Sequence, residues 1–128
     1  MLFDHVDFRV ADLAATRPLY DALLPALGYT KINADDESRG YHRPDETGAE
    51  PFFWLVEDRS HRPGGTRVAF AVPTREDVDR LSGLMREQGA RCFEPAELIT
   101  EYGANYYASF FEDAEGNKLE ICCRIRPA

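Results

Sequence analysis

Residues 5–10, His-Val-Asp-Phe-Arg-Val, and residues 67–72, Arg-Val-Ala-Phe-Ala-Val, repeat one pattern in the two halves of the chain. The runs start at positions 5 and 67, a step of 62 residues, and Phe8/Phe70 and Val10/Val72 keep that step. Each run alternates apolar and polar side chains, which is typical of a strand with one buried face. A repeat of this length indicates two copies of one supersecondary unit, because neither copy can bury its apolar face alone.

A helix is expected after each of these strands. Asp12 is a suitable N-cap, leucines then recur at every fourth position, and Gly28 ends the pattern. In the second half Thr74 is the matching cap, and the apolar stripe runs to Gly89. Pro18 fits best in a first turn, so we expect the regular part of the first helix to begin near it.

Further strands are predicted up to Ile32 and over 41–43, 52–56, 91–94, 106–111 and 118–123, with a linker over 57–65 that holds Pro-Gly-Gly. Each half then reads strand, helix and two or three strands. The sequence predicts an α+β fold in a single domain, 1–128, built from two tandem βαβββ modules at about 1–57 and 66–124. We expect their strands to form one curved, mostly antiparallel sheet, an incomplete barrel with the helices outside.

The composition narrows the classes of partner. The chain has 128 residues, 44% of them hydrophobic and 30% charged, which is ordinary for a globular protein. A net charge of −8 disfavours nucleic acid and anionic membrane surfaces. There is no apolar stretch of the length that crosses a bilayer, and the start of the chain lacks a basic segment followed by a long apolar one. We therefore expect a cytoplasmic protein.

Alternation places several reactive side chains on the inner, concave faces of the expected sheet. His5 and Asp7 lie on the inner face of the first strand, Arg67 lies on the inner face of the equivalent strand in the repeat, and Glu120 lies on the inner face of the last strand. A carboxylate on such a face must be paired or solvated. The aromatic runs 52–54 and 106–111 also turn half of their side chains inward, although the sequence leaves the parity of 106–111 open.

Residues 110–120, Phe-Phe-Glu-Asp-Ala-Glu-Gly-Asn-Lys-Leu-Glu, carry a more specific signal. Together with His5 and the Arg67-Val-Ala-Phe strand, this run resembles the glyoxalase/bleomycin-resistance/dioxygenase family, also called the vicinal oxygen chelate superfamily. The resemblance spans essentially the whole chain. It implies the same paired βαβββ fold and a ligand cavity on the concave face.

In metal-dependent members of that family, the resemblance implies a divalent ion held by residues at the positions of His5, Arg67 and Glu120. A further glutamate comes, in the glyoxalase I branch, from the strand that here contains Trp54. A guanidinium has no lone pair to give a metal, so this chain keeps only part of the site, His5 and Glu120. Asp7 is a possible extra ligand. We therefore expect no cofactor and regard a divalent metal as disfavoured.

Two functions remain open. One is an enzyme, a glyoxalase-like lyase or isomerase or a dioxygenase-type protein, in which Glu120 is catalytic and a metal is used if His5 and Glu120 suffice. The other is a binding protein that holds a small organic molecule, with Arg67, Trp54, Tyr107 and Asp7 as the binding residues. An ion pair between Arg67 and Glu120 would serve either structure or binding. Exposed strand edges and the resemblance both favour a homodimer.

Overall fold

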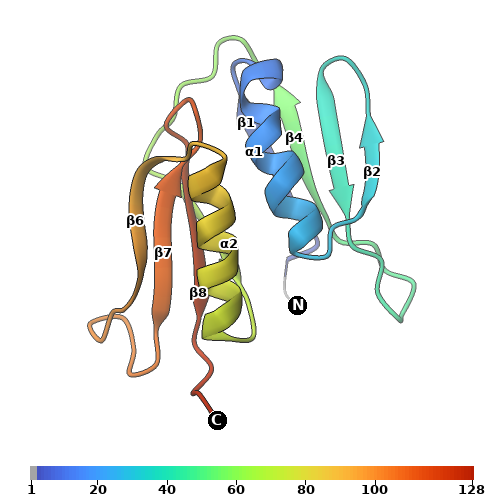
Figure 1. The fold of residues 1–128 in the computed structure, drawn as a ribbon. Coiled ribbons are helices and arrows are strands. Elements are labelled where there is room, and N and C mark those ends of the chain that lie inside the picture. The colour runs from blue at the N-terminus through green and yellow to red at the C-terminus, as the bar shows by residue number, and fades with distance from the viewer. Residues whose placement is uncertain (1–2) are drawn as a thin grey trace. The chain divides into compact units, whose positions relative to one another are not determined.

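The computed structural model describes residues 3–128, which fall into two compact units that divide after Arg62. The first unit contains β1 (His5–Val10), α1 (Leu13–Ala26), β2 (Lys31–Ala34), β3 (Ser38–His42) and β4 (Phe52–Glu57). The second contains β5 (Arg67–Ala71), α2 (Arg75–Glu87), β6 (Arg91–Leu98), β7 (Tyr107–Glu112) and β8 (Lys118–Cys123). Both follow the order βαβββ, so the predicted tandem modules are confirmed (Figure 1).

Each unit has a four-stranded mixed sheet of the same topology. The strand orders are β1-β4-β3-β2 and β5-β8-β7-β6. In both, the first strand pairs in parallel with the last, and the remaining pairs are antiparallel. This shared pairing relates positions on β1, β4 and β3 to equivalent positions on β5, β8 and β7.

The helix of each unit packs on one face of its own sheet, as Figure 1 shows. Leu23 and Leu24 of α1 meet Phe53 and Leu55 of β4 in a core from which these four side chains are almost fully excluded from solvent. In the second unit the corresponding side chains come from α2, β7 and β8: Leu81, Met85, Phe111, Leu119 and Ile121. Burial of these apolar side chains is the main stabilisation of each unit.

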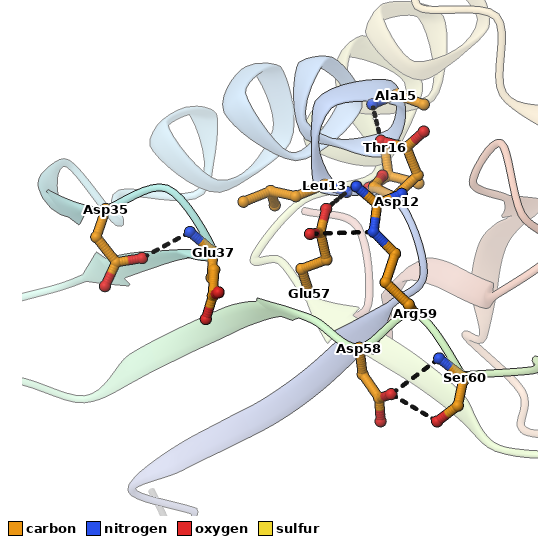
Figure 2. A network of polar contacts seen from close by, with 10 residues as sticks. All are labelled: Asp12, Leu13, Ala15, Thr16, Asp35, Glu37, Glu57, Asp58, Arg59 and Ser60. Atoms are coloured by element: carbon orange, nitrogen blue, oxygen red, sulfur yellow. Dashed lines mark hydrogen bonds and ion pairs between the residues drawn. The ribbon is translucent and has the colours of Figure 1, made fainter.

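Helix α1 begins at Leu13, five residues before the start that Pro18 led us to expect. Asp12 accepts a hydrogen bond from the Ala15 amide at 3.2 Å, and the Glu57 carboxylate accepts one from the Leu13 amide at 3.0 Å (Figure 2). Two amides of the first turn are therefore satisfied by side chains. That capping starts the helix early, and Pro18 lies inside it.

Strand β6 extends to Leu98, beyond the 91–94 stretch that the sequence indicated. Its pairing with β7 shifts register twice, and Cys92 has a positive φ of 49°. Pro95 is tolerated because β6 lies at the edge of its sheet. Among residues 3–128, no helix has the length and apolar character needed to cross a membrane.

Candidate functional site

The first sheet has a face turned away from α1, which we call the distal face of the first sheet. Register and alternation place on it side chains from all four strands: His5, Asp7, Arg9, Lys31, Asn33, Ser38, Gly40, His42, Phe52, Trp54 and Val56. His5, Asp7 and Trp54, three of the predicted site residues, therefore share one face of one unit. The middle row across the sheet reads Asp7, Trp54, Gly40 and Asn33.

A hollow of about 340 Å³ lies on this distal face. Its lining is Asn33, Ala34, Asp35, Ser38, Gly40, His42, Phe52 and Trp54. Gly40 is buried in the row between Trp54 and Asn33, so the missing side chain leaves space at this point. A Cβ at Gly40 would come within 3.1 Å of His42 Nε2. We call this space the Gly40 hollow.

Aromatic rings form one side of the Gly40 hollow. Phe52 lies between two imidazoles: the His5 ring stacks on it at 4.5 Å, and the His42 ring lies 5.1 Å away, tilted by 32°. Trp54 keeps 39% of its surface exposed, which is unusual for the largest apolar side chain. Flat, exposed π-faces beside a hollow are suited to stacking against a planar ligand.

His42 belongs to β3 and lines the Gly40 hollow, although the sequence did not single it out as a site residue. Its Nε2 lies 3.2 Å from the Asn33 amide nitrogen, and its Nδ1 is buried with no hydrogen-bond partner among residues 3–128. Sequence reasoning missed this residue because alternation over the three predicted residues 41–43 does not fix which side chains face the cavity.

Asp35 provides the carboxylate of the Gly40 hollow. Its Oδ1 accepts hydrogen bonds from the Glu37 amide at 2.9 Å (Figure 2) and from the Ser38 hydroxyl at 3.0 Å. These two bonds, the Glu37 amide first, lower the pKa of Asp35 below its usual value. The group is therefore ionised at neutral pH.

His5 and Asp7 lie beside this hollow on β1. The side chain of His5 is 45% exposed, and its Nδ1 lies 2.7 Å from Asp4 Oδ1. Asp7 is exposed and is the β1 neighbour of Trp54. Both predicted residues therefore face solvent next to the aromatic wall.

The second sheet also has a face turned away from its helix, which we call the distal face of the second sheet. Arg67, Phe110 and Glu120 lie on it. The Arg67 guanidinium carbon lies 4.9 Å from the centre of the Phe110 ring, a cation–π contact. Glu120 is only 5% exposed.

The partner of Glu120 is Tyr106, whose hydroxyl donates to Oε2 of the carboxylate. Tyr106 lies just before β7, is 6% exposed and packs with Ala108 and Cys122. Burial, followed by the hydrogen bond to Glu120, raises the pKa of Tyr106, so the phenol keeps its proton. Arg67 and Glu120 thus share a face, yet each is engaged by an aromatic residue. The sequence did not single out Tyr106.

Tyr107 lies on the opposite side of the second sheet from Glu120. Its hydroxyl donates to Asp79 of α2 at 2.6 Å, and the Arg75 guanidinium carbon lies 5.4 Å from its ring centre. The parity of β7, which the sequence left open, turns Tyr107 toward α2 and Phe110 toward Glu120. Tyr107 is therefore not brought together with Glu120 or Arg67.

The shared topology makes Trp54 the counterpart of Glu120. Trp54 pairs with Asp7, two residues after His5, and Glu120 pairs with Ala69, two residues after Arg67. On the neighbouring strands Gly40 opposes Trp54, whereas Phe110 opposes Glu120. At equivalent positions, the first sheet therefore has Trp54 beside the Gly40 hollow, and the second sheet has Glu120 beside Phe110.

Comparison with protein families gives a match over residues 2–121 to the model of the Glyoxalase/Bleomycin resistance protein/Dioxygenase superfamily. The chain belongs to this superfamily. The resemblance of residues 110–120 is thereby confirmed. No curated protein matches the chain.

Several solved structures share the fold of this chain. A crystal structure of a glyoxalase/bleomycin resistance protein from Albidiferax ferrireducens T118 has a TM-score of 0.78 and 26% identity, covering 99% of this chain and 100% of that one. A superfamily enzyme from Burkholderia phytofirmans PsJN has a TM-score of 0.70 and 19% identity, covering 95% and 98% of the two chains. The fosfomycin resistance protein FosX from Listeria monocytogenes has a TM-score of 0.69 and 14% identity, covering 96% and 93%. The last two show the fold alone.

The residues of this superfamily member do not make up the metal-binding set that the resemblance implies. Arg67 has no lone pair to donate, and the position equivalent to Glu120 in the first sheet is Trp54. Glu120 accepts a hydrogen bond from Tyr106. Across residues 3–128, no three His, Cys, Asp or Glu side chains lie together in a group able to hold a metal. Catalytic metal sites usually have three protein ligands.

Proposed function

We propose that this superfamily member binds a small, flat organic molecule in the Gly40 hollow and does so without a catalytic metal. The observation that carries the proposal is the hollow itself, with exposed Trp54 on one side and Gly40 in place of a side chain. Its volume of about 340 Å³ suits a compact ligand of one or two rings. Stacking on Trp54 and Phe52 would remove apolar surface of both partners from water.

The donor set supports the metal-free part of the proposal. His5 forms its contacts with Asp4 and Phe52, and Glu120 forms its own with Tyr106. With Arg67 at the third position, a bound ion would have two protein ligands from this set. Binding in the Gly40 hollow depends on none of these three residues.

Ligand binding can be followed at Trp54, the single tryptophan of the chain. The protein gives one indole N–H cross-peak in a proton–nitrogen NMR spectrum, and a panel of one-ring and two-ring aromatic compounds is titrated against it. Saturable shifts of this peak are expected. Gly40→Leu should abolish them by filling the hollow, whereas Gly64→Leu should leave them intact, because a Cβ at Gly64 meets nothing within 4 Å.

Trp54→Ala, measured by calorimetry, is a second test that needs little rearrangement because Trp54 is partly exposed. Loss of binding in both Gly40→Leu and Trp54→Ala supports the proposal. A panel that leaves the indole peak unmoved, or unchanged affinity in folded Gly40→Leu protein, would sink it. In parallel, dialysis against Zn, Ni, Mn and Fe should show no stoichiometric tight binding; tight binding would overturn the metal-free part.

A second candidate function is catalysis at Glu120, and the observation that favours it is the near-complete burial of this carboxylate. In that case the protein is a glyoxalase-like lyase or isomerase, or a dioxygenase-type enzyme, and Glu120 acts as the base. Glu120→Gln should then abolish any turnover that the wild-type protein shows. Unchanged turnover would remove Glu120 from the chemistry.

We also propose a homodimer, in keeping with the unpaired edges that β1 and β2 present within their sheet. One chain has a mass of 14.5 kDa, and light scattering at micromolar concentration should give twice that mass. A mass of one chain would contradict it.

A further inference from the structure

We propose that the ligand of the Gly40 hollow is a planar organic cation, with its ring on Trp54 and its positive charge held by Asp35. This inference rests on the proposed function and adds the charge of the ligand. It follows from which charged groups line the hollow and from what each of them contacts.

The lining of the Gly40 hollow contains one carboxylate, Asp35, and no lysine or arginine. A second carboxylate, Asp7, is exposed on the strand beside Trp54. Adjacent strands are about 4.8 Å apart, so this charge contributes to the potential at the aromatic wall. The local field is negative and favours a cation over a neutral or anionic ligand.

The lysine and arginine side chains on the strands of the first sheet are engaged by carboxylates of their own. Lys31 Nζ lies 2.7 Å from Glu50, Arg9 lies 3.6 Å from Asp58, and Arg39 lies 2.7 Å from Asp21. Arg39 also points to the α1 side of the sheet, because its partner belongs to α1. These ion pairs keep positive charge from cancelling the field of Asp35.

Asp35 can contact a ligand without giving up its structural role. Both of its side-chain hydrogen bonds, from the Glu37 amide and the Ser38 hydroxyl, end on Oδ1. The positive charge of a ligand can therefore approach Oδ2 while the turn stays closed. The ionised carboxylate attracts this charge at short range, and the face of Trp54 attracts the same positive charge.

The test compares three probes of matched size, N-methylquinolinium as the planar cation, quinoline at pH 8 as the neutral ring, and 2-naphthoate as the planar anion. Binding is followed at the Trp54 indole peak and by calorimetry. We expect N-methylquinolinium to bind about ten-fold more tightly than quinoline, and 2-naphthoate to bind most weakly. The tetramethylammonium ion, which is charged but not planar, should bind more weakly than N-methylquinolinium.

Asp35→Asn is the decisive variant, because an asparagine Oδ1 still accepts the two turn hydrogen bonds while the charge is lost. In this variant the affinity for N-methylquinolinium should exceed the affinity for quinoline by no more than about three-fold. Asp45→Asn is the matched control: Asp45 Oδ1 accepts from the Thr47 and Ala49 amides in a similar turn, but it does not line the hollow. The control should keep the wild-type preference. Asp7→Asn should weaken cation binding by a smaller factor.

The outcomes separate the two proposals. Equal affinity for N-methylquinolinium and quinoline, or an unchanged preference in Asp35→Asn, would overturn the cation inference while leaving flat-ring binding in place. Failure of every probe to bind would overturn both. A preference that falls equally in Asp35→Asn and Asp45→Asn would show a general effect of net charge, which also contradicts the assignment of Asp35.

Discussion

The two sheets have the same topology, but their distal faces are used in opposite ways. In the first sheet Gly40 lies beside Trp54 in the middle row, and a hollow of about 340 Å³ lies there. In the second sheet the equivalent row places Phe110 beside Glu120, and Tyr106 closes over the carboxylate. The two units thus share their strand order, but one has a hollow where the other has a buried hydrogen bond.

This difference shows which face tolerates change. A hollow lined by partly exposed side chains adds little to folding, because its residues have few contacts to lose. A carboxylate that is 5% exposed depends on its one phenolic donor, since a buried charge without a partner is strongly disfavoured. Substitutions on the first distal face should therefore affect binding, and those on the second should affect stability.

The largest effect is expected for Tyr106→Ala, which removes a buried ring and the hydrogen bond to Glu120. The free energy of unfolding should fall by about 3 to 5 kcal/mol, measured by urea denaturation. Tyr102→Ala is the control, since this ring is 60% exposed, and it should cost less than about 1 kcal/mol. Equal losses in the two variants would show that Tyr106 is not a special support of the second sheet.

The next largest effect on stability is expected from exchanging the large and the small residue at two equivalent positions, Phe110 in the second sheet and Gly40 in the first. Phe110→Ala opens the second sheet and should destabilise the protein by about 2 kcal/mol, because a half-buried ring and its contact with Arg67 are lost. Gly40→Phe fills the first sheet and should change stability by less than about 1 kcal/mol, while abolishing ligand shifts at Trp54. If Gly40→Phe destabilises more than Phe110→Ala, the two faces do not differ as described.

The contact between Tyr106 and Glu120 can be measured by a double-mutant cycle of Tyr106→Phe and Glu120→Gln. A coupling of about 1.5 kcal/mol is expected, as for a buried hydrogen bond to a charged group. The matched cycle, Tyr107→Phe with Asp79→Asn, joins a similar pair on the other side of β7 that is exposed. It should give about 0.5 kcal/mol or less.

The same contact predicts a pH dependence with a definite sign. The pKa of Tyr106 is raised in the folded protein, so the native state holds the phenolic proton more tightly than the unfolded chain does. Its contribution to stability is complete below about pH 10 and is lost as the pH rises above that value. Tyr106→Phe should therefore flatten the alkaline fall in stability, measured by urea denaturation between about pH 9 and 11. An identical fall in the variant would contradict this assignment.

The sequence was sufficient to predict the repeat, the βαβββ order and the residues that share the distal face of β1. The strands follow from period-two alternation, and the helices follow from their caps and from apolar residues at every fourth position. It could not predict the Gly40 hollow. The missing side chain of Gly40 leaves a cavity only because the strand register places Gly40 opposite Trp54, and the sequence does not give that register. It also left the parity of residues 106–111 open, and the structure brings Tyr106, rather than Tyr107, to Glu120. A one-residue change of parity turns a side chain to the other face of a sheet. Tyr106 also lies outside the strand, in a loop closed by the Ile99 amide bonding to its carbonyl.

The smallest expected effect concerns Arg67, the residue whose place in the repeat first set this chain apart from a metal-binding pattern. Its guanidinium lies over Phe110 and not against Glu120, so Arg67→Ala should cost only about 0.5 kcal/mol in urea denaturation. Arg126→Ala, on the exposed C-terminal segment, is the matched control and should cost nothing measurable. A loss of several kcal/mol in Arg67→Ala would mean that the guanidinium neutralises the buried Glu120. The second distal face would then be built around an ion pair, and Tyr106 would serve only to cover it.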